Sequence, residues 1–369
     1  MLLKTMALVI ADNDLTNLGD LTNLRSLAAV PFGGRYRIID FILSSLVNSG
    51  INHIGVITKS KYRSLMDHIR TGASWDLDRL ESGLTIIPPY MGVTGLRRNT
   101  SDLSVIYDYI ADHKADYVVI ANCNYIYNID LDDFLQAHVQ SKADITVMYN
   151  KDGMRFSKPV ISLVLDDDKN IEDMYYNNPV PPSEDTAIGL VVFSKNVILD
   201  IIGRHMMLKS NEDFTLTMLL EDYADYKVKA YETKAIIQRI NSTRDYFAAN
   251  MGLLNRSVRE AIFDPNRPIY TRVKNEEPAR YCKGSYVGNS LVSDGCQIEG
   301  TVTNSILFRG VKVGRHAHID SSVLMEGTVV DEGVELQNVI IDKGSILTRW
   351  TCLIGDREHP FLVRKDVQI

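Results

Sequence analysis

The stretch that decides the fold of the C-terminal part, residues 304 to 324, reads Asn-Ser-Ile-Leu-Phe-Arg-Gly-Val-Lys-Val-Gly-Arg-His-Ala-His-Ile-Asp-Ser-Ser-Val-Leu. Its aliphatic residues Leu307, Val313 and Ile319 fall six residues apart. Aliphatic residues at this spacing stack into an interior ladder when each coil of the chain makes three faces. An antiparallel sandwich would instead need alternating polar and apolar residues with hairpin turns. The stretch therefore predicts a left-handed parallel β-helix.

The same pattern continues on both sides of this stretch, over residues 281–369. A short motif recurs every 15 to 17 residues, as Asn289-Ser290-Leu291, Asn304-Ser305-Ile306, Ser321-Ser322-Val323 and Asn338-Val339-Ile340. The six-residue spacing of aliphatic side chains also recurs, at Val292/Ile298, Leu324/Val330/Leu336 and Ile341/Leu347/Leu353. Since each recurrence corresponds to one coil, we expect four to five coils.

Before residue 245 the pattern is different, because short apolar runs alternate with stretches of helical period. The predicted strands are Met6–Ala11, His53–Thr58, Tyr117–Ala121, Asp144–Tyr149, Val160–Leu165, Ile188–Phe193 and Tyr226–Glu232. The helical stretches include Arg37–Asn48, Lys61–Arg70, Asp102–His113 and Leu131–Gln140, the last with Asp130 as its expected N-cap. This alternation predicts an α/β domain over residues 1–245, with a mixed, mostly parallel sheet and helices on both faces.

Residues 246–280 are expected to connect the two parts. Phe247, Met251, Leu254, Val258 and Ile262 recur at helical spacing and predict one amphipathic bridging helix. The run Asp-Pro-Asn-Arg-Pro at residues 264–268 then breaks that helix. The polar stretch up to residue 280 should therefore be an extended linker.

The composition excludes several classes of protein. A net charge of −7 argues against a general nucleic-acid binder, whose binding domain is usually basic. Asp12 and Asp14 interrupt the apolar start of the chain, which is therefore too short to span a membrane and is expected to form a buried strand. The four cysteines show neither CxxC spacing nor a paired framework, which indicates reduced thiols in a cytoplasmic protein.

One block of the N-terminal part resembles a known family. It reads Pro-Phe-Gly-Gly-Arg-Tyr-Arg-Ile-Ile-Asp-Phe at residues 31–41, and Asn-Ser-Gly-Ile follows at residues 48–51. This is similar to bacterial glucose-1-phosphate adenylyltransferases (ADP-glucose pyrophosphorylases), which combine a nucleotidyltransferase-like (Rossmann-like) domain with a short C-terminal left-handed β-helix. The resemblance covers essentially the whole chain. It implies glycogen (ADP-glucose) synthesis, a cytoplasmic location and a tetrameric assembly.

The phosphate-binding loop that the resemblance implies is altered in this chain. Catalytic relatives carry Gly-Gly-Arg-Gly-x-Arg-Leu, which lets the backbone approach the triphosphate. The corresponding residues here are Asp12, Asn13, Asp14, Leu15, Thr16, Asn17 and Leu18. A like charge about 4 Å from a phosphate costs roughly 4 kcal/mol at an effective dielectric constant near 20. We therefore expect a solvated acidic turn in place of a phosphate site.

The positions that the resemblance assigns to magnesium and to the sugar phosphate are altered too. The family's Gly-Asp-His turn corresponds to Cys123-Asn124-Tyr125, and its second metal carboxylate corresponds to Arg239. A lysine of its Lys-Pro pair corresponds to Leu27, and the lysine of its Asp-Phe-Gly-Lys motif corresponds to Leu216. An amide or an arginine offers no negative charge to a hard dication. We therefore predict that neither a catalytic nor a metal-binding residue remains.

Two other groups of residues have weaker functional interpretations. Arg97 and Arg98 lie beside the remnant of the family's Gly-Thr-Ala-Asp segment and are candidates for an anion site, although paired loop arginines are more often simply solvated. His316 and His318 fall in a turn of the β-helix. Some β-helix acyltransferases use a histidine base, but a surface turn is the favoured interpretation because this β-helix is short and no partner acid is evident.

These observations predict a pseudoenzyme, in which an intact fold carries a degenerate site. The expected function is that of a non-catalytic regulatory subunit, of the glycogen biosynthesis protein D type, which assembles with a catalytic glucose-1-phosphate adenylyltransferase and modulates it. We expect no cofactor on this chain, and neither nucleic acid nor a membrane as partner. Two alternatives stay open. One is a weakly active adenylyltransferase that uses relocated acids such as Asp102 or Asp130, and the other is a module that senses a sugar nucleotide or another small-molecule effector.

Overall fold

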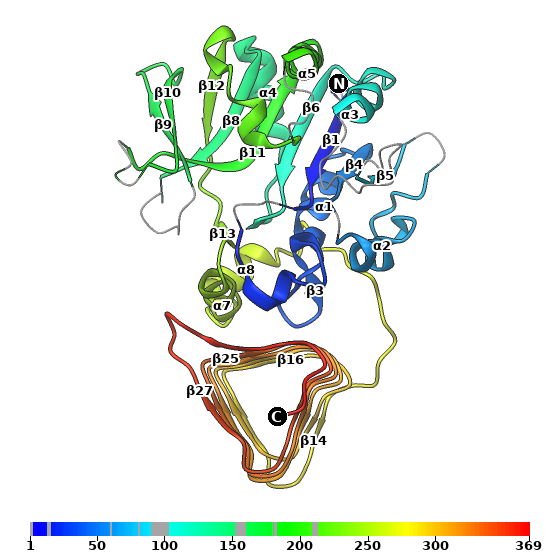
Figure 1. Ribbon diagram of the computed structural model, residues 1–369, viewed down its shortest axis with the longest axis vertical. Helices are drawn as coiled ribbons and strands as arrows, with labels where there is room; N and C mark the ends of the chain where they lie inside the picture. The colour runs from blue at the N-terminus through cyan, green and yellow to red at the C-terminus, as the bar shows by residue number, and fades with distance from the viewer. Residues whose placement is uncertain are drawn as a thin grey trace.

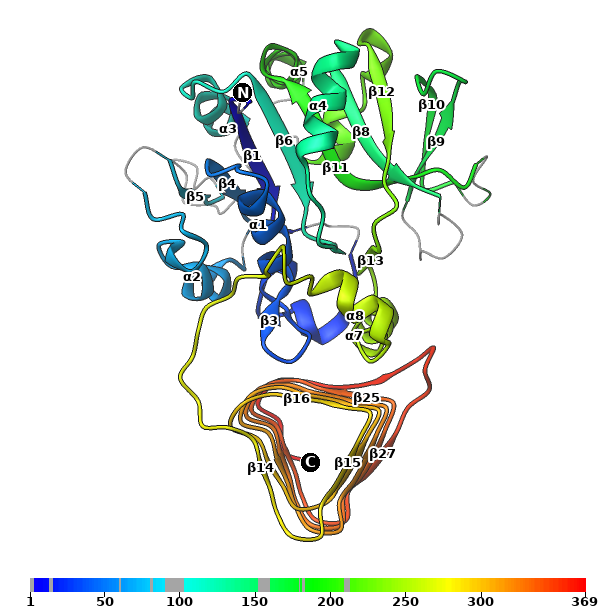
Figure 2. The same cartoon turned by 180° about the vertical axis from the view of Figure 1, so that it is seen from behind.

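The computed structural model describes residues 3–12, 16–59, 61–79, 82–89, 103–151, 160–178, 180, 183–208 and 213–369. Figures 1 and 2 show two parts, an N-terminal domain built on a twisted sheet and a triangular coil that lies beneath it. An extended segment connects helix α8 (Arg256–Ile262) with β14 (Arg280–Tyr281), the first strand of the coil. The predicted combination of an α/β domain and a C-terminal β-helix is confirmed.

The N-terminal sheet is mixed and consists of β1 (Thr5–Ile10), β4 (Ile54–Ile57), β5 (Leu84–Ile87), β6 (Tyr117–Asn122), β8 (Ile145–Asn150), β9 (Ile161–Leu165), β10 (Ile171–Tyr176), β11 (Thr186–Ser194) and β12 (Val228–Glu232). Its strand order is β10-β9-β11-β6-β1-β4-β5, and β8 pairs with both β11 and β12. Strands β6, β1, β4 and β5 are parallel, whereas β11 is antiparallel to its neighbours. The carboxyl ends of the parallel strands therefore meet at one edge.

Helices cover both faces of this sheet, because successive side chains of each strand point to opposite sides. On β1, Ala7 and Val9 face one hydrophobic core, while Met6, Leu8 and Ile10 face the other. The first core is covered by α1 (Ile38–Asn48), α2 (Arg63–Ile69) and α4 (Asp132–Ser141). The second is covered by α3 (Leu103–Ala111), α5 (Lys195–Leu208) and α6 (Leu216–Leu219). Among the described residues, no helix is long and apolar enough to cross a membrane.

Short elements complete the N-terminal domain. The 3₁₀ turns are η1 (Gly19–Thr22), η2 (Leu27–Ala29), η3 (Ala73–Trp75) and η5 (Tyr223–Asp225). Two-stranded ladders join β2 (Pro31–Phe32) to β3 (Tyr36–Arg37), and β7 (Tyr125–Ile126) to β13 (Gln238–Arg239). The second ladder brings together two segments that are more than a hundred residues apart in the sequence.

The region expected to be one bridging helix forms two helices, α7 (Thr243–Gly252) and α8. The Ser242 hydroxyl accepts a hydrogen bond from the Asp245 backbone N–H and caps α7. The Asn255 side chain accepts one from the Ser257 N–H and caps α8. Because Asn255 supplies the acceptor for a new helix start, the chain turns there although the apolar spacing continues. Both helices contribute side chains to the first N-terminal core.

Three parallel sheets of five strands each form the β-helix. The first contains β14, β17 (Gln297–Ile298), β20 (Lys312–Val313), β23 (Val329–Val330) and β26 (Ile346–Leu347). The second contains β15 (Tyr286–Gly288), β18 (Thr301–Thr303), β21 (His318–Asp320), β24 (Glu335–Gln337) and β27 (Cys352–Ile354). The third contains β16 (Leu291–Val292), β19 (Ile306–Leu307), β22 (Val323–Leu324), β25 (Val339–Ile341) and β28 (Phe361–Val363). The predicted ladder of Leu307, Val313 and Ile319 lies in the interior, so the six-residue spacing is confirmed.

The third of these sheets fastens the β-helix to the N-terminal domain. Its outward residues Ile306, Val323 and Ile340 are fully buried and belong to the same core as β1 and α1. Outward residues of the other two sheets are mostly polar, as at the exposed Lys312. An ion pair between Arg25 Nη2 and Asp342 Oδ2, 2.6 Å apart, is also buried between the two parts. The β-helix therefore packs on the N-terminal domain through a continuous core.

Candidate functional site

A cavity of about 260 Å³ opens at the edge where β1 and β6 end. The structure brings four of the degenerate positions together in its wall, namely Asp12, Asn124, Leu216 and Arg239. Its other lining residues are Ile10, Asn122, Tyr125, Val160, Ile161, Tyr176, Ala187, Gly189, Thr215 and Thr217. Ligands of open α/β sheets gather at this edge, which makes the cavity the candidate functional site.

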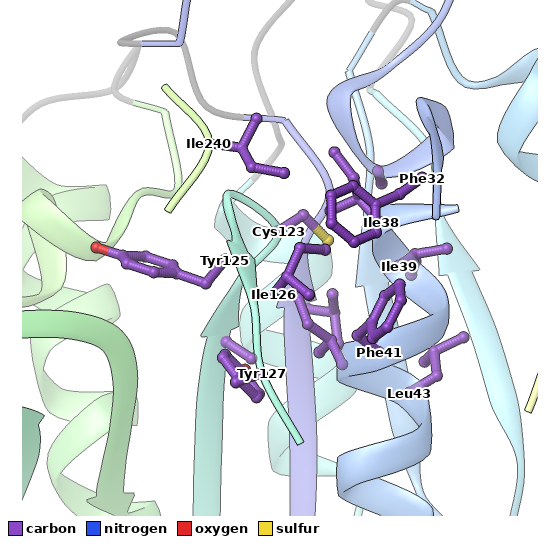
Figure 3. Close-up of a cluster of buried hydrophobic side chains, with 14 of the residues drawn as sticks. Phe32, Ile38, Ile39, Phe41, Leu43, Cys123, Tyr125, Ile126, Tyr127 and Ile240 are labelled. Atoms are coloured by element: carbon purple, nitrogen blue, oxygen red, sulfur yellow. The ribbon is translucent and has the colours of Figure 1, made fainter. Parts of the chain in front are cut away.

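In the turn that follows β6, the Cys123 side chain is buried in the core and Asn124 lines the cavity. Cys123 lies within a buried apolar cluster (Figure 3), and burial raises the pKa of its thiol. The Asn124 Nδ2 donates to Asn241 Oδ1 at 2.8 Å, and the Asn124 carbonyl accepts from the Ile240 N–H at 2.8 Å. The Asn124 Oδ1 is buried and accepts no hydrogen bond within the described ranges. This position therefore offers a neutral acceptor and no charge.

Tyr125 and Arg239 lie opposite each other in the ladder between β7 and β13. The Arg239 guanidinium lies over the Tyr125 ring, 5.7 Å from its centroid. Gly189 (φ +71°) lies against the same ring, and a Cβ at Gly189 would come within 2.6 Å of Tyr125 Cε2. Figure 3 shows the Tyr125 side chain pointing away from the apolar cluster around Cys123 and Phe32. An aromatic ring and a cation thus occupy the side of the cavity where metal carboxylates would be expected.

The donor set does not fit the magnesium ion that the family resemblance implies. Magnesium requires oxygen ligands, usually including one or two carboxylates, in near-octahedral geometry. At the two expected positions the chain carries the Asn124 amide and the Arg239 guanidinium. The described residues contain no cluster of three or more His, Cys, Asp or Glu side chains that could hold a metal ion. Neither position can therefore supply the carboxylate ligand that a magnesium ion needs.

Asp12, which stands where the family's phosphate loop begins, binds the protein's own backbone. Its Oδ1 accepts from the Leu27 N–H at 3.1 Å, and its Oδ2 accepts from the Lys59 N–H at 3.4 Å. The Lys59 ammonium forms an ion pair with Asp213 Oδ2 at 2.8 Å. These two backbone N–H groups already have an anionic acceptor from the protein, and a carboxylate at the cavity wall repels a phosphate.

Three of the positions that were predicted to be degenerate carry no charge, namely Leu27, Leu216 and Asn17. Leu27 is buried in η2, and Leu216 is buried as the first residue of α6. The Asn17 N–H donates to the Asn241 carbonyl at 2.8 Å, and its side-chain oxygen accepts from the Gly19 N–H. None of the three side chains presents a cation to the cavity.

Six of the predicted candidates lie outside the described residues, namely Asn13, Asp14, Leu15, Arg97, Arg98 and Asp102. Asp130 is exposed, and α4 begins at Asp132 with Leu131 in the N-cap position, so the expected cap is wrong by one residue. The Asp130 Oδ1 still accepts a hydrogen bond from the Asp132 N–H, at 3.0 Å.

The two histidines of the β-helix occupy different environments. His316 lies in a turn with a left-handed backbone (φ +58°). His318 was expected in the same turn, but it begins strand β21 and points outward between Thr301 and Glu335 of the neighbouring coils. Outward strand positions follow from the alternation of side chains, which the turn interpretation missed. Neither histidine lines a described cavity.

Sequence reasoning missed a second hollow, a cleft of about 130 Å³ between the N-terminal domain and the β-helix. We call it the basic cleft, because its lining includes the cations Arg35, Arg37, Arg272, Lys274, Arg309 and Lys343 against the acids Asp67 and Glu326. Arg35 and Arg37 were visible within the distinctive 31–41 block. The other cations come from the linker and from two coils of the β-helix, so only the fold shows that they converge.

Arg309 is the buried cation among those that line the basic cleft. Its side chain is buried, and its Nε and Nη2 find no acceptor within the described ranges. Burial lowers the pKa of this guanidinium, and the nearby Arg35 acts in the same direction. Glu326 balances part of the charge through ion pairs with Lys274 and Lys343. The lining of the basic cleft therefore includes a buried guanidinium with two N–H groups that lack an acceptor within the described ranges.

Comparison with known proteins agrees with this architecture. The family described as nucleotidyl transferase matches residues 8–254, and the family described as GlmU-like, C-terminal hexapeptide matches residues 275–359. The chain is 34% identical over 366 residues to the glycogen biosynthesis protein GlgD of Geobacillus stearothermophilus. This alignment covers 98% of this chain and 96% of the relative. It is 29% identical over 359 residues to the glucose-1-phosphate adenylyltransferase of Bacillus cereus (strain ATCC 10987 / NRS 248), covering 95% and 94% of the two chains. This chain belongs to the nucleotidyl transferase family, among the relatives of glucose-1-phosphate adenylyltransferase and GlgD.

Proposed function

We propose that this chain is a non-catalytic, regulatory subunit that acts in glycogen synthesis by assembling with a catalytic glucose-1-phosphate adenylyltransferase. The observation that carries the proposal is the cavity in which Asn124, Arg239 and Leu216 stand where the family's metal acids and lysine are expected. The described strands and helices of the N-terminal domain form a regular fold around that cavity. Such a chain can bind a homologue and change its properties without turning over substrate.

The chemistry explains why the cavity should be inactive. Joining ATP to glucose 1-phosphate brings several phosphates together, which requires fixed cations, a metal ion and N–H groups aimed at the oxygens. Losing one such charge-stabilising group typically costs about 10²–10³ in rate. Here Leu27 and Leu216 provide no charge, and Asp12 presents a carboxylate that binds two backbone N–H groups. We infer that magnesium and ATP bind at the catalytic partner in the cytoplasm.

The names of the relatives support both the proposed role in glycogen synthesis and the proposed catalytic partner. One relative is named a glycogen biosynthesis protein, and others are named glucose-1-phosphate adenylyltransferases. Because both kinds align over nearly the whole of this chain, a catalytic relative has the same shape and can replace one copy in a hetero-oligomer. We expect a tetramer. The regulation is allosteric if this chain binds one conformation of its partner more tightly than the other.

The test combines assembly with kinetics. Magnesium-dependent formation of ADP-glucose is measured for this chain alone, for a catalytic relative that retains the Gly-Asp-His turn, and for the two co-expressed. We expect no turnover by this chain alone and a changed kcat or KM in the mixture. As a control, the mixture is repeated with the partner's metal aspartate replaced, which should abolish all turnover.

Two results would contradict the proposal. One is recovery of two separate homo-oligomers at every mixing ratio, measured by gel filtration with light scattering. The other is robust turnover by this chain alone, which would favour the weakly active adenylyltransferase instead.

The basic cleft favours a second function, binding of a phosphorylated effector without chemistry. Arg309 is buried with two donor nitrogens that lack an acceptor within the described ranges, and five further cations line the same cleft. Calorimetry with inorganic phosphate and with fructose phosphates tests this function. Arg309→Gln should abolish binding, whereas Arg315→Gln, at an exposed arginine paired with Glu299 outside the cleft, should not. Flat titrations with the unmodified chain would remove this candidate.

A further inference from the structure

A groove of about 510 Å³ lies between helix α7 and the β-helix. It runs along the corner where the second sheet of the β-helix turns into the third, and Figures 1 and 2 show α7 above this corner. We call it the α7 groove, which is lined from residues 244–254, from three coils at the corner and from residues 357–358. None of its lining residues also lines the cavity or the basic cleft. Its volume falls within the range of about 300–1,000 Å³ that small-molecule sites occupy.

One wall of the α7 groove is apolar. Phe247, Ala248, Met251 and Leu254 provide it. Phe247 is buried, Met251 and Leu254 are half-buried, and Ala248 is exposed. The accessible part of this wall is therefore mainly aliphatic, and it lacks the open aromatic face on which a nucleobase stacks.

The opposite wall is a row of uncharged polar side chains, one from each of three successive coils, namely Asn289, Asn304 and Ser321. Their backbones are left-handed, with φ between +45° and +47°, a conformation that asparagine adopts more readily than most residues. The Asn289 Nδ2 donates to Asn304 Oδ1 at 2.8 Å, and the Asn304 Nδ2 donates to Asp320 Oδ1 at 2.9 Å. These bonds fix the row. Both asparagines are exposed, and each amide has further N–H groups and lone pairs for a ligand.

The protein itself balances the charged groups of the α7 groove. Arg244 Nη2 forms an ion pair with Glu358 Oε2 at 2.5 Å, which joins α7 to the loop between β27 and β28 (red beside α7 in Figure 1). Burial opposes ionisation of Asp320, but hydrogen bonds to its oxygens and the positive charge of Arg357 outweigh burial and lower its pKa. An anionic ligand would have to compete with both carboxylates for these arginines. The α7 groove is therefore suited to a neutral ligand.

The two walls together define the chemistry of that ligand. A hydroxyl group both donates and accepts hydrogen bonds, as a side-chain amide does, so the polar row is matched to hydroxyl groups. The aliphatic wall requires an apolar face on the other side of the same ligand. Sugar rings have both, because C–H groups cover their faces and hydroxyls project from their edges. Neighbouring coils lie about 4.8 Å apart, so the row of three spans roughly 10 Å, which is longer than a single ring.

We propose that the α7 groove binds a neutral oligosaccharide of two or more rings, with its C–H faces against Met251 and Leu254 and its hydroxyls at Asn289 and Asn304. This site is separate from the cavity and from the basic cleft. It therefore goes beyond the proposed regulation of a catalytic homologue and does not depend on it.

The experiment uses the full chain alone with maltotriose as the probe, and binding is measured by calorimetry and by saturation-transfer NMR. Ala248→Phe fills the groove from an exposed position on α7. Ala111→Phe, at the exposed last residue of α3, makes the same change outside the groove and is the matched control. We expect equal Kd values for the unmodified chain and for Ala111→Phe. Ala248→Phe should weaken maltotriose binding at least tenfold, because the added ring occupies the ligand's space.

A second pair of variants tests the polar row. Asn304→Gly removes the amide but keeps the left-handed backbone without strain. Asn177→Gly makes the same change at another exposed asparagine with positive φ (+53°), outside the groove. Asn304→Gly should weaken maltotriose binding about threefold to tenfold, as the loss of a neutral hydrogen bond does, and Asn177→Gly should leave it unchanged.

Thermal melting shows whether each variant is folded, and adenosine is titrated beside maltotriose as a neutral ligand that carries a base. The proposal would be overturned by an unmodified chain that binds no maltotriose at millimolar concentrations. Binding that folded Ala248→Phe and Asn304→Gly variants leave unchanged would overturn it too, and so would tighter binding of adenosine than of maltotriose. These outcomes leave the regulatory function untouched, because that function is measured in mixtures with a catalytic homologue.

Discussion

The two hollows of this molecule differ in the charge that they carry. The cavity at the sheet edge has an amide at Asn124 and an aliphatic side chain at Leu216, where phosphates and a metal would need charge. The basic cleft gathers six cations and holds Arg309 buried. Burying a cation without a paired acceptor is costly, so a site that does so is suited to an anionic ligand. The proposed anion site and the altered cavity are thus separate places in the molecule, and a ligand of the first would not need the chemistry of the second.

The basic cleft is also the place where the two parts of the chain are coupled. Arg37 belongs to the N-terminal domain, Lys274 to the linker, and Arg309, Glu326 and Lys343 to the β-helix. Burial lowers the pKa of Lys343, while the nearby Glu326 favours its charged form. An anion in the cleft would contact both parts of the chain at once, whereas a ligand in the cavity would contact the N-terminal domain alone.

The largest expected effect comes from breaking the buried ion pair beside the cleft. Arg25→Ala leaves the Asp342 carboxylate buried and without its partner at 2.6 Å. Removing one member of a buried pair destabilises a protein by about 3–5 kcal/mol. Denaturant unfolding should show this loss, and the double variant Arg25→Leu/Asp342→Leu should regain much of it. An Arg25→Ala variant as stable as the unmodified chain would show that the pair does not hold the two parts together.

A smaller loss of stability is expected in the cavity, at Gly189. Its φ of +71° is unfavourable for other residues, and an added Cβ would lie 2.6 Å from the Tyr125 ring. Gly189→Ala should therefore destabilise the fold by about 1–3 kcal/mol through overpacking. Gly203→Ala is the control, because Gly203 lies within α5 and its nearest contact would be at 4.0 Å. Equal melting temperatures for the two variants would argue against a packed Tyr125–Arg239 wall.

A still smaller effect is expected from Glu326 in the basic cleft, which should make the stability of the fold depend on pH. Burial opposes ionisation of Glu326, but Lys343 and Lys274 outweigh it and lower the pKa of this carboxyl from 4.5 to about 2. Between pH 4.5 and about 2, Glu326 is therefore ionised in the folded state and protonated in the unfolded state. Its contribution is complete above pH 4.5 and is lost as the pH falls toward 2.

Comparison with a neutral variant measures this contribution. After allowance for its partial exposure, Glu326→Gln should cost about 1–2 kcal/mol at neutral pH and flatten the stability profile between pH 4.5 and 2. Glu335→Gln, at an exposed residue of β24, should leave the profile unchanged. An unaltered profile in Glu326→Gln would show that other carboxylates dominate acid unfolding.

The sequence predicted the regular parts of the molecule better than its hollows. The ladder of Leu307, Val313 and Ile319 is a local repeat, so its spacing alone predicts the coil. The break at Asn255 was missed because apolar spacing continues through it, and the cap decides where a new helix starts. The basic cleft depends on residues that are distant in sequence, such as Arg37 and Lys343, and no local pattern places them together.

The smallest expected effect is the gain of activity when one metal carboxylate is restored. Asn124→Asp returns an acid to the turn after β6, but the Arg239 guanidinium remains over the Tyr125 ring in the same cavity wall. The new carboxylate would meet that cation before a magnesium ion, so we expect calorimetry to detect no magnesium binding and turnover to stay at background. The double variant Asn124→Asp/Arg239→Asp should bind magnesium more tightly than either single variant. It should still make ADP-glucose very slowly, because Leu27 and Leu216 provide no cation for the phosphates. Rapid turnover by Asn124→Asp alone would mean that the cavity lacks only one catalytic group. The cavity and the basic cleft would then not differ in their capacity for chemistry in the way that we propose.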